Sequence, residues 1–201
     1  METYTENNFL RLVGAPGRPE PSHVCRGEVF YLLPLSVRRL SGTEDELPLL
    51  LRRRQLEALE LGGGERLCVG GALRSYNNRG GALPRLRLTV LARTACFCDG
   101  PDENRVLLAG ALCRPPSLRR TPLGREICDL MLAVNRSYGR SDYLPCICWG
   151  AAAREAARWP VGARVRLEGR FQSRSYVKLT DEGPVSRTAF EVSAAAIERL
   201  E

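Results

Sequence analysis

A stretch of aromatic rings and guanidinium groups between residues 121 and 150 has the composition of a surface that stacks unpaired nucleic-acid bases. It reads TPLGREICDLMLAVNRSYGRSDYLPCICWG. Because residues two apart along a strand share a face, Tyr143, Ile147 and Trp149 lie together, and Leu144 lies on the other face with the cysteines that follow it. Rings that face outward beside cations suit base stacking over a neutralised backbone. The arginines that flank these rings are Arg119, Arg120, Arg125, Arg136 and Arg140.

The segment from Arg164 to Tyr176 carries a second outward-facing set of side chains. Apolar residues such as Val165 and Leu167 alternate with polar ones, so one face is apolar and the other is mostly basic. Core packing does not require these cations and the terminal ring, although a solvated face that ends in a tyrosine is the alternative interpretation. The outward residues in the second half of the segment are Arg170, Gln172, Arg174 and Tyr176.

The elements that must position these side chains are short strands in a repeated order. In the second half of the chain we predict strands at 105–112, 127–135, 143–149, 164–176 and 186–194, with a helix at 151–158. In the first half we predict strands at 10–14, 29–38, 47–51, 66–75 and 83–92, with a helix at 53–61. Three strands, a helix and two strands at short spacing favour a small closed barrel over a sandwich.

Several segments of the two halves correspond at a nearly constant offset, which indicates an internal duplication. Asn8 matches Asn104 at an offset of 96, and Pro48 matches Pro145 at an offset of 97. The segment GALRSY at 71–76 then resembles GRFQSRSY at 169–176. A nearly constant offset that drifts only through loop insertions is the mark of a repeat. The sequence therefore predicts two domains, at 1–98 and 103–201, joined through the Gly-Pro segment between them.

The C-terminal half resembles the single-stranded DNA-binding protein family. The motifs that carry the resemblance are TP-x-G, LAVNR, the aromatic strand that ends in WG, and EGR-x-QSRSY, in that order. The resemblance runs from about Asn104 to Leu200 with few gaps. It implies the five-stranded OB barrel. With the duplication, it predicts an all-β protein with one short helix per domain, built as two tandem OB-fold barrels.

The resemblance assigns a role to each outward side chain of the C-terminal barrel. The base-stacking rings that it implies are Tyr138, Tyr143, Trp149 and Tyr176. The side chains expected to contact the DNA backbone beside them are Arg119, Arg120, Arg136, Arg140, Arg170, Gln172 and Arg174. Trp159 follows a helix and precedes a proline, so we expect it to pack in the core.

The N-terminal barrel departs from this pattern. Glu46 and Arg52 stand where the C-terminal barrel has Tyr143 and Trp149, so two stacking rings are missing. Weaker DNA contact and an assembly surface both fit such a barrel, and the sequence leaves both open. The residues that would form a secondary DNA-binding surface are Arg38, Arg39, Arg74 and Tyr76.

The function that the resemblance implies is to bind and protect single-stranded DNA with little sequence preference, in replication, recombination or repair. An RNA-binding OB protein and an OB-fold protein–protein adaptor are the alternatives. The family usually presents four OB folds per assembly, which implies a homodimer of this chain. The chain ends at AAAIERLE rather than in the acidic tail that many members use to recruit enzymes, so we do not expect that mode of recruitment.

Composition limits the other classes of function. The formal net charge is +7 and the sequence pI about 9.2, which fits nucleic acid or an anionic membrane surface. No apolar run approaches the roughly 18 residues of a membrane span, and the segment METYTENNFLRL lacks the basic region and apolar stretch of a secretion leader, so we expect none. We therefore expect no membrane association. The resemblance adds a cytoplasmic, nucleoid-associated location in a bacterium, a phage or another mobile element.

Metal chemistry and catalysis find little support in the sequence. The chain has eight cysteines, but the Cys-x-Cys spacing at 96–98 and 146–148 would put both thiols on one face of a strand, where cysteine acts as a small apolar residue. His23 is the only histidine, and the chain has no phosphate-binding GxxxxGK[ST] loop. We expect no metal, no cofactor, no small-molecule substrate and no enzymatic activity.

Overall fold

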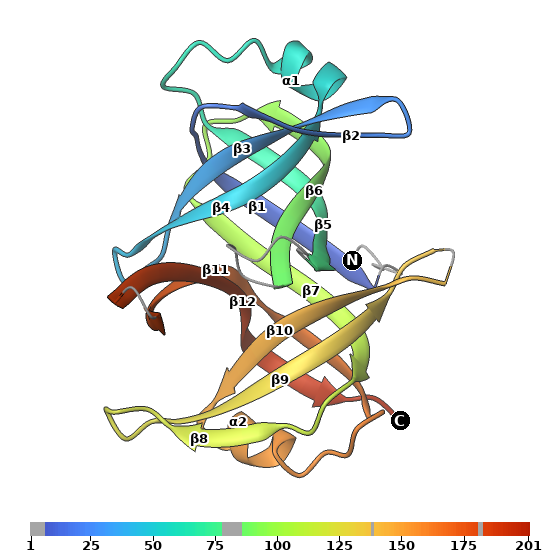
Figure 1. Cartoon of the computed structure of the whole chain (residues 1–201), viewed down its shortest axis with the longest axis vertical. Helices are drawn as coiled ribbons and strands as arrows, with labels where there is room; N and C mark the ends of the chain where they lie inside the picture. Colours follow the sequence, from blue (N-terminus) through green and yellow to red (C-terminus); the bar gives the residue numbers. More distant parts are fainter. Residues whose placement is uncertain (1–6, 78–85, 138, 181–182) are drawn as a thin grey trace.

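The structure, a computed structural model, describes residues 7–77, 86–137, 139–180 and 183–201. Two barrels are stacked along the long axis of the molecule, and each carries its helix at the outer end (Figure 1). Within these ranges the chain is all-β apart from two short helices, as the sequence predicts.

The N-terminal barrel consists of five strands that close on themselves. Their bounds are β1 Asn8–Pro16, β3 Glu28–Arg38, β4 Glu44–Arg52, β5 Leu67–Asn77 and β6 Leu86–Phe97, with helix α1 at Arg53–Leu59. The barrel closes where β1 pairs with β3, and where β4 and β6 pair in parallel through Leu49 and Val90. Leucines fill its interior, including Leu33, Leu47 and Leu73, which have no exposed surface.

The C-terminal barrel repeats this arrangement. Its strands are β7 Glu103–Leu112, β9 Glu126–Asn135, β10 Ser141–Trp149, β11 Arg164–Thr180 and β12 Gly183–Arg199, with helix α2 at Gly150–Ala156. The pairing of β7 with β9 closes it, together with a parallel pairing of β10 with β12. Phe171 and Trp159 are buried in its core, so the prediction that Trp159 packs inside is confirmed.

Each barrel also has an edge strand that the sequence did not predict. These are β2 at Glu20–Cys25, which pairs with β3, and β8 at Ser117–Arg120, which pairs with β9. All residues of both strands are exposed. A strand exposed on both faces has no apolar alternation, and that alternation is the signal from which strands are predicted.

The strand order shows how the two halves are related. All strands belong to one twelve-stranded sheet, in the order β2-β3-β4-β6-β5-β1-β7-β11-β12-β10-β9-β8. The second half of this order repeats the first in reverse, and β1 and β7 join the barrels as an antiparallel pair. Leu10 lies opposite Val106, its own equivalent at the offset of 96. The barrels are therefore related by an approximate two-fold axis. We propose the segment between Phe97 and Glu103 as the domain boundary.

Glycine at position 169 permits the closest approach of β11 to β12. A Cβ atom added there would lie 2.2 Å from the carbonyl oxygen of Ser193, beside the bulge between Glu168 and Gly169. We expect Gly169→Ala to destabilise the protein by about 2 kcal/mol, because two strands must separate. Chemical unfolding measures this loss. The control is Gly100→Ala, whose Cβ would meet no atom within 4 Å, and equal stabilities of the two variants would contradict the prediction.

Candidate nucleic-acid interface

The aromatic rings of β10 lie at its two ends and face outward. The side chains of Tyr143 and Trp149 are 48% and 39% exposed, whereas Leu144, Cys146 and Cys148 are buried. One face of this strand thus lies in the core, and the other carries the two exposed rings. The prediction that Ile147 also faces outward is wrong, because Ile147 is buried where β10 pairs with β12. Both rings combine a large flat surface with solvent access, which is what base stacking requires.

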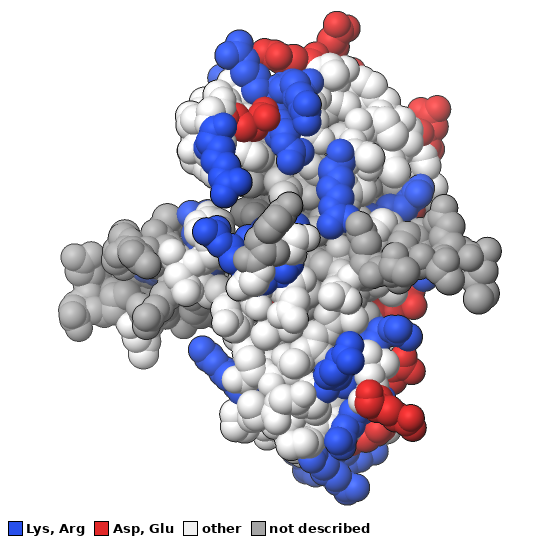
Figure 2. Space-filling model, turned by 90° about the vertical axis from the view of Figure 1, so that its right-hand side faces the viewer, with Lys and Arg blue, Asp and Glu red and all other residues white. Residues whose placement is uncertain are grey.

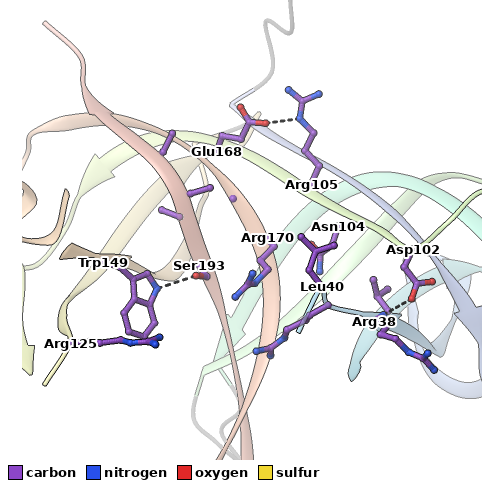
Figure 3. Close-up of a pocket in the computed structure, with 16 residues that line it drawn as sticks. Arg38, Leu40, Asp102, Asn104, Arg105, Arg125, Trp149, Glu168, Arg170 and Ser193 are labelled. Carbon is purple, nitrogen blue, oxygen red and sulfur yellow. Dashed lines mark hydrogen bonds and ion pairs between the residues drawn. The ribbon is translucent and has the colours of Figure 1, made fainter. Parts of the chain in front are cut away.

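Trp149 borders a cavity of about 870 Å³ that both barrels line. Its indole Nε1 donates a hydrogen bond to Ser193 Oγ at 3.3 Å, which fixes one edge of the ring. In Figure 3, Arg125 lies beside the indole and Arg170 lies farther along the cavity. Leu40, at the turn between β3 and β4, reaches this cavity from the N-terminal barrel. We call this space the Trp149 cavity.

A chain of hydrogen bonds along β11 and β12 positions two of the predicted arginines. Arg170 Nε donates to Gln172 Oε1 at 3.0 Å, and Gln172 Nε2 donates to Glu191 Oε1 at 3.0 Å. Glu191 Oε2 lies 3.5 Å from Arg174 Nε, and the guanidinium carbon of Arg174 lies 5.7 Å from the centroid of the Tyr176 ring. Gln172 and Glu191 are buried, so the prediction that Gln172 faces outward is wrong: its amide lies beneath the surface, where it bonds Arg170 and Glu191.

Arg39 and Asp45 join the β3–β4 turn to the C-terminal barrel. Arg39 donates to both carboxylate oxygens of Asp45 at 2.6 Å. Asp45 Oδ1 also accepts bonds from the backbone N–H and the hydroxyl of Ser173, each at 2.7 Å. Burial alone would raise the pKa of Asp45, but the bonds from Arg39 and Ser173 outweigh it and lower that pKa. The turn is therefore held on β11, beside Gln172 and Arg174.

Asp142, the equivalent of Asp45 at the offset of 97, forms the reciprocal bridge. It is fully buried and accepts bonds from Arg136 Nε at 2.7 Å, from Arg74 Nη1 at 3.0 Å and from the backbone N–H of Ser75 at 2.6 Å. Arg136 also donates to the carbonyl oxygen of Ser75 at 3.1 Å. The guanidinium groups of Arg136, Arg74 and Arg39 thus hold the barrels together, a role that the sequence prediction of DNA contacts did not foresee.

The other predicted residues occupy varied surroundings. Arg119 and Asp129 form a two-point ion pair, and the bond to Asp129 raises the pKa of Arg119. Arg120 is 76% exposed and lies 3.6 Å from Glu126. Tyr138 lies outside the described residues. Three further predicted residues are accessible on the surface, namely Arg38, Tyr76 and Arg140.

Three residues of this site were not predicted from the sequence. Glu191 stands between Phe190 and Val192 in an otherwise apolar run, and an acid inside such a run is the one hint of a buried polar network. Leu40 and Ser193 have ordinary local sequences. Their part in the Trp149 cavity arises from contacts between distant segments, which no local pattern reports.

Basic side chains also extend beyond this site. Figure 2 shows Lys and Arg side chains over both barrels and across the waist between them. Among the described residues, no group of three or more histidine, cysteine or acidic side chains is arranged to hold a metal ion. No helix within the described ranges has the length and apolar character that crossing a membrane requires.

Comparisons with known proteins point to one family. The profile of the "Single-strand binding protein family" matches residues 103–200. A single-stranded DNA-binding protein of Oceanobacillus iheyensis is 34% identical over 107 residues, which cover 49% of this chain and 63% of that protein. Single-stranded DNA-binding protein B of Bacillus subtilis is 38% identical over 80 residues, which cover 36% of this chain and 71% of that protein. The match to the first of these relatives spans less than two-thirds of its length.

Solved structures extend the similarity to both barrels. The wild-type single-stranded DNA binding protein of Thermus aquaticus superposes with a TM-score of 0.79 and 25% identity, and the match covers 96% of this chain and 93% of that one. A deletion mutant of the same protein gives a TM-score of 0.76 at 26% identity, with 96% and 94% of the two chains covered. The resemblance in fold therefore includes the N-terminal half, which the family profile does not reach.

Proposed function

We propose, because this chain belongs to the single-strand binding protein family, that it binds single-stranded DNA along the outer face of its C-terminal barrel. The observation that carries the proposal is the exposure of Tyr143 and Trp149 toward the two ends of one strand, with the Trp149 cavity and its arginines beside the indole. The names of its relatives describe binding proteins, and the chain is not an enzyme.

The mechanism combines stacking with neutralisation of phosphates. Each base stacked on a ring contributes roughly 1–3 kcal/mol, and each phosphate neutralised on a single strand adds about −0.7 to the slope of log K against log salt. Arg125, Arg170 and Arg174 lie close enough to the rings to meet the backbone of the same strand. Every base has a face that can stack, so we expect little sequence preference.

Assembly, location and cellular role belong to the same proposal. A dimer of this chain would bring together four OB folds, and we propose that the protein acts as such a dimer. Coating of unpaired DNA would serve replication, recombination or repair in the bacterial cytoplasm, with the protein at the nucleoid. The relatives reported above come from bacteria, which supports a bacterial source.

A fluorescence titration tests the proposed function against its alternatives. Oligo-dT that stacks on Trp149 and the tyrosines quenches their emission, and added salt reverses the quenching because phosphate contacts release counterions. Matched RNA serves as the competitor. Equal binding of RNA would favour an RNA-binding protein, and an absence of quenching at low salt would favour the protein–protein adaptor.

A further inference from the structure

A second cavity, of about 610 Å³, lies where equivalent segments of the two barrels meet. Pro48 of β4 and Pro145 of β10 both line it, and these prolines correspond at the offset of 97. The beginning of β6, at 86–88, and the segment 185–191 of β12 form the remaining walls. We call this space the seam cavity, because it belongs to neither barrel alone.

The seam cavity is strongly cationic. Arg87, Arg174 and Arg187 line it, and Glu191 is the one acidic residue among its described lining. Glu191 already accepts a hydrogen bond from Gln172 and pairs with Arg174. The charge that remains in the cavity is therefore positive, and its apolar walls strengthen the attraction of an anion.

Arg187 has a donor that the protein itself does not satisfy. Its Nε is buried and, among the described residues, has no hydrogen-bond partner. A buried N–H group without an acceptor costs free energy, and native structures tolerate few of them. An acceptor oxygen delivered by a ligand would remove this cost. The guanidinium fork suits a phosphate, which offers two oxygens in matching geometry.

The seam cavity continues the proposed path of the DNA. The Trp149 cavity is lined by 168–170 and 193–196 of the β11–β12 hairpin, and the seam cavity by Arg174 and 185–191 of the same hairpin. Arg187 lies directly opposite Tyr176 in the pairing of these strands. A strand that stacks on Trp149 and Tyr176 would therefore arrive next at Arg187.

We propose that the seam cavity binds the phosphodiester backbone of single-stranded DNA where the strand leaves Tyr176 and crosses to the N-terminal barrel. Arg187 and Arg87 donate to the phosphate oxygens from the two sides of the cavity. This assignment rests on the proposed function. In this arrangement the N-terminal barrel contributes to DNA binding through Arg87, although it lacks two of the stacking rings.

The test compares Arg187→Met and Arg87→Met with Arg54→Met, a control at an exposed arginine on α1 at the far end of the barrel. The probes are oligo-dT of about 30 nucleotides and of about 8, on either side of the site size of one OB fold. We expect each seam variant to bind the long probe about tenfold more weakly. Its salt slope should fall by about 0.7 for each lost phosphate contact. The control should bind both probes as the wild type does.

Thermal unfolding without DNA separates binding from structure. Because Arg187→Met removes an unsatisfied donor, its Tm should not fall, although its affinity for the long probe does. A lower Tm with unchanged affinity would show that Arg187 is structural, and unchanged affinity of both seam variants would likewise overturn the seam assignment. In both cases wild-type binding of oligo-dT would leave the proposed function standing, whereas its absence would remove both proposals.

Discussion

The double variant Tyr143→Ala/Trp149→Ala should lose about a hundredfold in affinity for oligo-dT while it remains folded. Two stacking platforms at roughly 1–3 kcal/mol each account for such a loss. Both side chains are partly exposed, at 48% and 39%, so their removal leaves the core intact. Among the described residues, the side-chain hydrogen bond that these substitutions remove is the one from the indole to Ser193. A fluorescence-anisotropy titration with labelled oligo-dT measures the change.

The salt dependence of the same titration shows whether the double variant has lost stacking contacts or phosphate contacts. Removal of rings lowers affinity at every salt concentration but leaves the slope of log K against log salt unchanged, because no phosphate contact is removed. The matched control is Phe97→Ala, which removes a ring of similar exposure (44%) at the end of β6. Equal affinities of the double variant and this control would contradict the role of β10.

Asp45→Ala should destabilise the protein by about 3 kcal/mol, because removal of one partner of a buried ion pair leaves the other charge uncompensated. Asp45 has no exposed surface, and its carboxylate joins Arg39 to Ser173 across the two barrels. Chemical unfolding at neutral pH measures the loss. The control is Glu168→Gln, which breaks an exposed ion pair with Arg105 and should cost less than about 1 kcal/mol.

Lowering the pH should remove part of the stability that Asp45 contributes to the wild-type protein. Since the pKa of Asp45 is lowered in the folded protein, its contribution to stability is fully present above the unfolded pKa of about 3.9 and is lost as the pH falls through the folded value. The difference in stability between wild type and Asp45→Asn should therefore narrow as the pH drops below about 4. A difference that stays constant down to the acid transition would show that the charge of Asp45 does not matter.

The barrels and the outward-facing rings could be predicted from the sequence, because both depend on the alternation of apolar and polar residues along single strands. A period of two along 143–149 places Tyr143, Ile147 and Trp149 on one outward face. The structure exposes the two rings but buries Ile147, which lies where β10 pairs with β12. The repeated order of elements likewise predicts two barrels, and the strand order of the sheet repeats in reverse as it should. The similarity to the Thermus aquaticus structures supports this double architecture.

The bridges between the barrels could not be predicted in the same way. Asp45 and Ser173 are 128 residues apart, and neither has a local sequence that marks it as buried or bonded. Arg39, Arg74 and Arg136 look like surface cations until Asp45 and Asp142 are placed beside them. The pattern of charges in a sequence does not distinguish an arginine that is available to bind a ligand from an arginine that forms an ion pair with a carboxylate of the protein.

The cysteines show a similar limit. Cys146 and Cys148 lie within β10 and are buried, whereas Cys96 is exposed near the end of β6 and Cys98 follows that strand. Burial raises the pKa of Cys148 to about 12, which keeps this thiol protonated. The two pairs differ because the strand of Cys146 runs through the barrel core, while Cys96 stands next to the last residue of β6. The spacing of two cysteines in a sequence does not indicate whether their part of the strand lies in the barrel core.

Photocrosslinking of oligo-dT to the wild-type protein, with the attached residues identified by mass spectrometry, tests the proposed interface most directly. Ultraviolet light joins thymine to residues in direct contact, so the positions recovered map the bound strand. We predict crosslinks at Trp149, Tyr143 and Tyr176. Excess unlabelled oligo-dT should suppress all of these crosslinks. Crosslinks confined to the N-terminal barrel, with none on β10 or β11, would contradict it.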